Sequence, residues 1–155
     1  MLGLYSIKKK EFIRTKVGTM AAIYGEDGTC YAKTPNWPGL SSYSAEFEDM
    51  AGNKANFDVN EVNHMKQSAK GMRDCGPAGI RLGGVKYVFL RHDPTYMATT
   101  LACPTGGASV VKTNKGYLIG VWSKTETMSN GNGQNAGDLA MSVERVGEFL
   151  RLAKF

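Results

Sequence analysis

Residues 79–122 hold the feature that most constrains the fold, a succession of short apolar runs separated by turn residues. The runs cover 79–84, 85–93, 97–102, 108–113 and 116–122. Runs of this length joined by brief Gly-, Asn- and Pro-containing turns are typical of β-strands that pair with their neighbours in sequence. A five-stranded antiparallel meander is therefore expected, and its apolar surface has to be covered by helices.

Helices are predicted at both ends of the chain. Residues 3–16 contain no proline and no glycine after Gly3, and Gly18 ends the segment. The second helix is expected to begin at Asp138 as its N-cap and to run to about residue 153. At 100° per residue, its apolar residues fall within roughly 80° of arc and form a core-facing stripe. These residues are Leu139, Val143, Val146, Leu150 and Ala153.

The segments around these elements are shorter. Residues 20–25 and 29–32 are expected to pair as a β-hairpin, because an Asp-Gly turn separates them. Residues 34–44 and 123–137 are rich in glycine, proline and polar residues, so both are predicted to be loops.

Two further helices are predicted in the middle of the chain. The first covers residues 45–51 and ends at Gly52. The second is capped by Asp58 or Asn60 and continues to about Lys70. Helices combined with a meander of sequential strands give an α+β class.

Positive charge is concentrated at one end of the chain. The net charge is +5, and residues 1–20 carry all but one unit of it. The remainder is nearly neutral, which argues against a general nucleic-acid surface. The basic helix is either an exposed, solvated face or a contact for anionic phosphoinositide headgroups. The phosphoinositide candidates are Lys8, Lys9, Lys10 and Arg14.

Cysteine usage and hydropathy bear on the compartment. The three cysteines, Cys30, Cys75 and Cys103, lie far apart without a Cys-x-x-Cys pair, which favours a reducing, cytoplasmic location. The first residues lack the order of a secretory signal, and no apolar run reaches the length of a transmembrane helix.

Two segments resemble cofactor-binding motifs, but each lacks a feature that the motif requires. Residues 106–113 end in Lys-Thr like a phosphate-binding loop, but a valine precedes the lysine and the segment is expected to be a strand. Residues 131–136 imitate a dinucleotide fingerprint without the strand that must precede it. The two histidines and three cysteines show no ligand or nucleophile spacing. No enzyme activity, cofactor or metal is expected.

Four segments in order resemble the profilin family. The first is the helix leading into Ala-Ala-Ile-Tyr and an Asp-Gly-Thr turn at 21–32. The others are Gly-Ile-Arg-Leu-Gly-Gly-Val-Lys-Tyr at 79–87, Gly-Gly-Ala to Val-Lys-Thr at 106–113, and Val-Glu-Arg-Val-Gly-Glu-Phe-Leu at 143–150. Residues 33–75 and 123–138 are expanded, as in longer protist- or archaeal-type members.

The resemblance implies one profilin-like domain over residues 1–155. Its central antiparallel sheet would have six or seven strands, with the terminal helices packed together on one face and short helices on the other. It implies a monomeric, cytoskeleton-associated protein that binds monomeric actin and regulates its polymerisation and nucleotide exchange. A second face would bind proline-rich partners such as formins, and this binding is expected to be weak in this chain. Phosphoinositides are a third expected partner.

Site residues carried over from the family fall on two surfaces. Residues expected to contact actin are Lys86, Val88, Arg91, Lys112, Ala140, Glu144 and Arg145. Residues expected to contact polyproline are Tyr5, Lys8, Tyr31, Phe149, Leu150 and Phe155. Phe149 and Phe155 lie outside the apolar stripe of the last helix, which is consistent with a surface role. Tyrosines stand where the family has tryptophans, and Lys8 replaces an aromatic residue.

Two other classes of function remain open at this point. A small-molecule sensory domain also combines an antiparallel sheet with flanking helices, but it requires an apolar cavity within the curl of the sheet. A lipid or nucleic-acid binder driven by residues 8–16 would show binding that falls steeply with salt.

Overall fold

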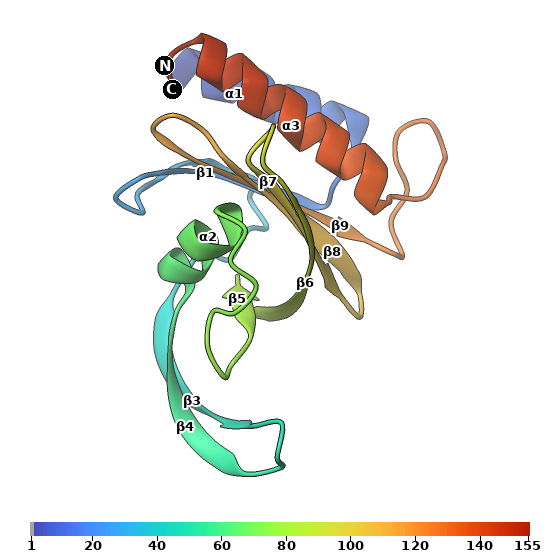
Figure 1. The fold of residues 1–155 in the computed structure, drawn as a ribbon. Coiled ribbons are helices and arrows are strands. Elements are labelled where there is room, and N and C mark those ends of the chain that lie inside the picture. Colours follow the sequence, from blue (N-terminus) through green and yellow to red (C-terminus); the bar gives the residue numbers. More distant parts are fainter. Residues whose placement is uncertain (1) are drawn as a thin grey trace.

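The computed structural model describes the backbone of residues 2–155 and the side chains of residues 9–155. Its centre is a seven-stranded antiparallel sheet in the order β2-β1-β9-β8-β7-β6-β5 (Figure 1). The predicted meander forms its larger part, and the predicted hairpin forms the other edge. The strands are β1 (Met20–Gly25), β2 (Cys30–Lys33), β5 (Ile80–Leu82), β6 (Val85–Asp93), β7 (Ala98–Cys103), β8 (Gly106–Lys112) and β9 (Gly116–Ser123).

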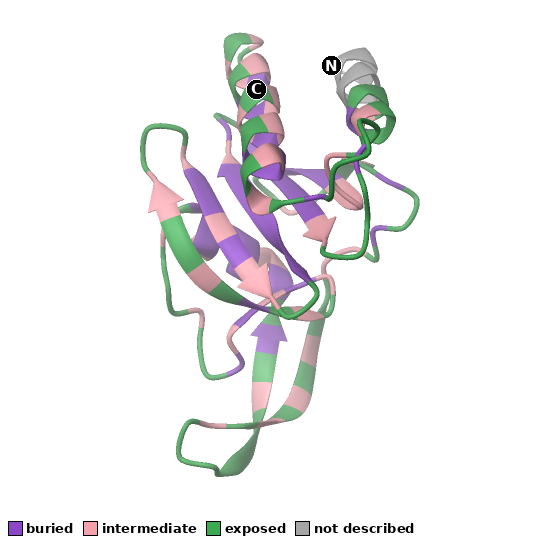
Figure 2. Ribbon diagram, turned by 90° about the vertical axis from the view of Figure 1, so that its right-hand side faces the viewer, coloured by how far each residue is buried: buried purple, intermediate pink, exposed green. Residues whose placement is uncertain are grey.

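Helices cover the two faces of this sheet. The helices α1 (Leu2–Thr15) and α3 (Ala136–Leu152) lie on one face, and α2 (Glu61–Ala69) lies on the other (Figure 1). Each face has its own buried cluster, one including Leu118 and Val143 and the other including Met65. Figure 2 shows that burial is concentrated in the middle strands and in the helix faces turned toward them. The predicted α+β architecture is therefore confirmed.

The prediction of a helix over residues 45–51 is wrong. Residues Ser42–Glu48 form β3, which pairs with β4 (Lys54–Asn60) in a separate two-stranded ribbon that extends away from the sheet (Figures 1 and 2). The rings of Phe47 and Phe57 stack at 6.5 Å, and the Arg81 guanidinium lies 4.3 Å from the Phe47 ring centre. Alternate side chains of β3 are half-buried, so a period of two outweighs the helical propensity of its glutamates. We call β3 and β4 the arm.

Asparagines cap two of the helices. Asn60 caps α2 by accepting a hydrogen bond from the Asn63 backbone, as one of the two predicted alternatives had it. At α3 the N-cap is Asn135 and not the predicted Asp138. Asp138 lies three residues later: its backbone N–H donates to the Asn135 side-chain oxygen at 2.9 Å, and its carboxylate accepts a 2.8 Å hydrogen bond from the Asn135 side-chain amide.

The polar segment before α3 has a structural role that its composition does not indicate. The Gln134 side chain donates to the Lys16 carbonyl oxygen at 2.9 Å, and its own oxygen accepts from Thr19 and from the Ser123 backbone. Ser129 donates from its backbone to the Thr15 carbonyl oxygen. The segment therefore caps the C-terminal end of α1 and holds it against β9.

Protonation of His64 is expected to destabilise the fold. His64 is buried, and its Nδ1 accepts a 2.8 Å hydrogen bond from the Arg81 backbone. Burial lowers the pKa of His64, Arg81 lowers it further, and Glu61 partly opposes the shift. Because the unfolded chain takes up this proton near pH ~6.5 while the folded chain does not, the free energy of unfolding should fall as the pH drops below that value. In urea titrations, His64→Asn should keep the acceptor and flatten this dependence, whereas an unchanged pH slope would contradict the assignment.

Candidate binding surfaces

The outward row of β6 is an exposed surface of mixed apolar and basic character. Tyr87 and Phe89 pack toward the α2 side of the sheet, so Lys86 and Val88 face the other way. The side chain of Val88 is 61% exposed. Leu90 has no pairing partner on β7, and as the bulged residue it is 52% exposed. Lys86 points away from the buried side, as the alternation predicts.

The end of β6 meets the outer side of α3. Burial and the nearby Asp93 raise the pKa of Glu144, and Arg91 opposes this rise, so these three charged groups share one corner. Arg91 and Arg145 are exposed. Ala140 is only 5% exposed, which removes its side chain from the expected actin surface. It is buried because it lies on the side of α3 that packs on the sheet.

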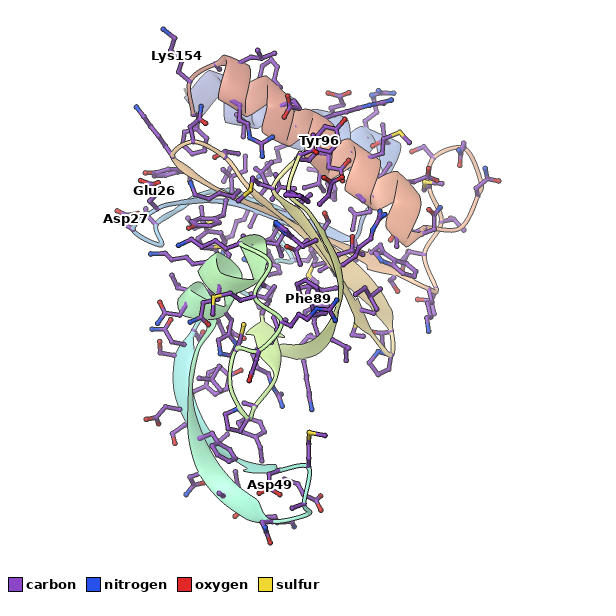
Figure 3. The ribbon with its side chains drawn as sticks, viewed as in Figure 1. Glu26, Asp27, Asp49, Phe89, Tyr96 and Lys154 are labelled. Atoms are coloured by element: carbon purple, nitrogen blue, oxygen red, sulfur yellow. The ribbon has the colours of Figure 1, made fainter. Side chains whose placement is uncertain are left out.

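Lys112 lies on the opposite side of the sheet from this row. Its ammonium is 3.3 Å from the Glu26 carboxylate and 5.1 Å from the ring centre of Tyr117, a residue of the α2-side core. Glu26 belongs to the turn between β1 and β2 (Figure 3). The structure therefore does not bring Lys112 together with Lys86 and Val88.

A bulge in β2 controls where Tyr31 lies. Ile23 pairs with Ala32 and Tyr24 pairs with Cys30, which leaves Tyr31 without a partner on β1. An unpaired extra residue bends the strand and re-aims its side chain. Tyr31 is consequently 41% exposed at the edge of the sheet.

Tyr31 and Phe155 form an aromatic pair on a floor of two glycines. Their ring centroids lie 5.9 Å apart in an edge-on arrangement. Gly25 and Gly116 pair across β1 and β9, and a Cβ on either would meet one of the two rings. Phe155 is only 4% exposed, although the helical pattern places it opposite the core. The difference arises because Lys154 takes a left-handed conformation and turns the last residue back onto the sheet.

The other expected aromatic and apolar contacts on α3 divide between core and surface. Leu150 is 0% exposed, so it is a core residue and offers no surface to a ligand. Phe149 is half-buried and lines a shallow surface depression with Tyr96 and Leu152. Figure 3 shows Tyr96 beside α3.

The basic residues of α1 are not equivalent. Lys10 and Arg14 are exposed, whereas Lys9 is half-buried above a pocket between α1 and the sheet. The side chains of Tyr5 and Lys8 lie outside the described residues. Among the described residues no cluster of potential metal ligands occurs, and no helix is long and apolar enough to cross a membrane.

Sequence reasoning missed two features of these surfaces. Leu90 continues the outward row of Lys86 and Val88, and the alternation along residues 85–90 contained that signal. The glycine floor beneath Tyr31 and Phe155 carried no sequence signal, because it depends on the register between β1 and β9.

Comparison with known proteins identifies the family. The family model for profilin matches residues 6–155, so the chain belongs to the profilin family. Profilin IA of Acanthamoeba castellanii superposes with a TM-score of 0.65 at 21% identity, covering 97% of this chain and 98% of that one. Profilin II of the same organism gives 0.62 at 24%, also with 97% and 98% coverage. LokiProfilin1, solved in complex with rabbit actin, gives 0.62 at 14% identity, with 97% and 96% coverage. The resemblance found in the sequence is thereby confirmed.

Proposed function

We propose that this profilin binds monomeric actin through the outward row of β6 together with the adjoining side of α3. The observation that supports this most directly is the exposed series Lys86, Val88 and Leu90 on β6 of a profilin-family chain. Exposed apolar side chains beside cations are suited to a protein surface with an apolar centre and acidic rim. A protein of similar fold has been solved with rabbit actin bound, which agrees with this partner.

The proposed effect on actin follows from differential binding. A partner that binds one conformation of actin more tightly shifts the population toward it, and this is sufficient to change polymerisation and nucleotide exchange without catalysis. Glu144, Arg91 and Arg145 would supply the charged rim beside the apolar centre.

Charge reversal on β6 tests the proposal. Fluorescence anisotropy of labelled monomeric actin should show that Lys86→Glu weakens binding by about 10-fold or more, because the new carboxylate faces an acidic surface. Val88→Asp should weaken it at least as much by placing a charge at the apolar centre. Lys70→Glu, an exposed lysine at the end of α2, is the matched control and should bind like wild type. Unchanged affinity in both β6 variants would exclude this surface.

The Tyr31–Phe155 pair favours a second binding function, for proline-rich segments. A polyproline II helix presents flat rings and docks on exposed aromatic side chains. Only Tyr31 of the pair is substantially exposed, which supports weak binding. The exposed Lys10 and Arg14 support a contact with phosphoinositide headgroups, each cation contributing roughly 1 kcal/mol near an anionic membrane.

A further inference from the structure

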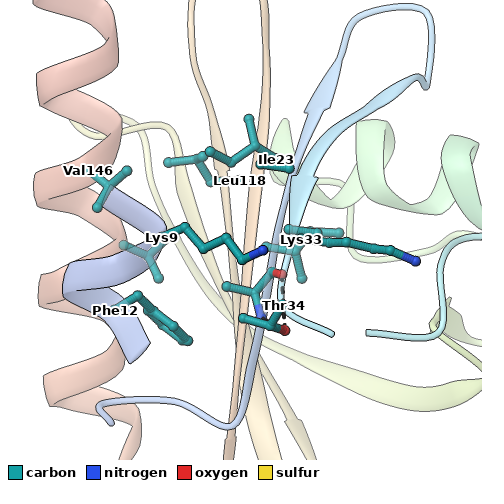
Figure 4. Close-up of a pocket in the computed structure, with 12 residues that line it drawn as sticks. Lys9, Phe12, Ile23, Lys33, Thr34, Leu118 and Val146 are labelled. Atoms are coloured by element: carbon teal, nitrogen blue, oxygen red, sulfur yellow. Dashed lines mark hydrogen bonds between the residues drawn. The ribbon is translucent and has the colours of Figure 1, made fainter. Parts of the chain in front are cut away.

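A small apolar pocket lies between α1, α3 and the sheet, and we call it the α1 pocket (Figure 4). Its walls are aliphatic and aromatic, and the alanines among them leave the space open. They include Phe12, Ala21, Ile23, Ala32, Leu118 and Val146. The volume of the pocket is about 50 Å³, against roughly 10–15 Å³ for one water molecule on the same measure. This size admits a short hydrocarbon chain and excludes a long one.

The Lys9 side chain lies at the mouth of the α1 pocket. Figure 4 shows the Lys9 side chain extending from α1 across the opening toward Lys33, the last residue of β2, and Thr34, which follows it. Lys9 is half-buried, and its ammonium makes no hydrogen bond or ion pair within residues 9–155. Lys33 also lines the α1 pocket, but its ammonium is directed away from the opening.

An apolar pocket with a charged group at its rim has the usual form of a small-ligand site. An occupant has to bury an apolar body against the alanine and valine side chains and place a negative group beside Lys9. A single half-buried ammonium balances one negative charge, so a monoanion fits better than a doubly charged phosphate.

We propose that the α1 pocket binds a short-chain aliphatic monocarboxylate, with its carboxylate at Lys9 and its chain against Ala32 and Val146. None of the residues that line the α1 pocket belongs to the β6 row or to the Tyr31–Phe155 pair. The proposal for this pocket therefore does not depend on whether the protein binds actin or proline-rich segments.

Hexanoate is the probe that tests this site, added to the full chain and followed by NMR. The methyl signals of Ile23, Ala32 and Val146 should shift in a saturable way at millimolar hexanoate. Hexan-1-ol, which has the same chain without the charge, should bind about 10-fold more weakly, since the contribution of Lys9 is absent. Equal affinity of the alcohol and the acid would overturn the role of Lys9 without any variant being needed.

Three variants complete the test. Lys9→Gln should reduce hexanoate affinity to that of the alcohol, and Ala32→Leu should abolish binding by filling the pocket. Lys10→Gln, an exposed neighbour that does not line the pocket, should leave the affinity unchanged. Methyl shift dispersion reports that each variant is folded. Loss of affinity in Lys10→Gln equal to that in Lys9→Gln, or an absence of shifts at Ile23, Ala32 and Val146, would overturn the proposal.

Discussion

Replacing Glu61 with alanine should lower the free energy of unfolding by about 3 kcal/mol, because two backbone donors lose their acceptor. Glu61 is 1% exposed at the start of α2. Its carboxylate accepts 2.9 Å hydrogen bonds from the backbones of Ser41 and Gly84, and a longer one from the Tyr43 hydroxyl. The N-terminal end of a helix also favours its negative charge. One side chain thus connects α2, the base of the arm and the turn between β5 and β6.

Equilibrium urea unfolding measures the loss, and amide hydrogen exchange shows where it acts. In Glu61→Ala the amide protons of β3 and β4 should exchange faster than those of β8 and β9, because the arm loses its anchor while the central strands keep their ladder. Glu61→Gln should fall between wild type and alanine, since the amide retains one acceptor. Glu46→Ala removes an exposed carboxylate from the same arm and serves as the control. A wild-type urea midpoint in Glu61→Ala would rule out this anchoring role.

The arm shows how far the fold can be predicted from the sequence. The central meander and the apolar stripe of α3 could be predicted because both depend on local periodicity, and β1 occupies the six residues expected. The sequence predicts a short helix over residues 45–51, where the structure has part of β3 and the turn that follows it. Alternation of Tyr43, Ala45 and Phe47 with polar residues did carry a strand signal, whereas the contact of Phe47 with Arg81, which is distant in sequence, could not be read from a local pattern.

The candidate surface residues also divide into those that local alternation could place and those that it could not. Lys86 and Val88 could be placed on the outward row of β6 from alternation alone. The burial of Leu150 and Ala140 was missed for different reasons. Leu150 belongs to the predicted stripe and was still carried over as a surface residue by family resemblance, whereas Ala140 lies beside that stripe. The position of Phe155 depends on the left-handed turn at Lys154, a conformation that lysine rarely adopts and that the sequence does not signal.

Substituting Gly116 with alanine should affect both stability and ligand binding, because this glycine on β9 lies against the backbone of β1 and against the Phe155 ring. An added Cβ would come within 2.2 Å of the Tyr24 carbonyl oxygen and 2.8 Å of the Phe155 ring. The backbone contact cannot be relieved by a side-chain rotation, so β1 and β9 have to separate locally. We expect a loss of about 3 kcal/mol in unfolding free energy, typical of overpacking against rigid neighbours. Binding of a proline-rich peptide should be lost as Phe155 leaves its position.

Gly25→Ala separates the two effects. The three atoms nearest to its Cβ would all belong to the Tyr31 side chain, with the hydroxyl at 2.5 Å, and a side chain can shift where the backbone cannot. Thermal unfolding should therefore change much less than in Gly116→Ala, while peptide binding measured by NMR titration should weaken to a similar extent. Gly133→Ala, where a Cβ meets no neighbouring atom, is the control for both measurements. If Gly25→Ala binds the peptide as wild type does, the Tyr31–Phe155 pair is not the proline site, because displacing one ring of the pair must reduce the surface on which a polyproline helix docks.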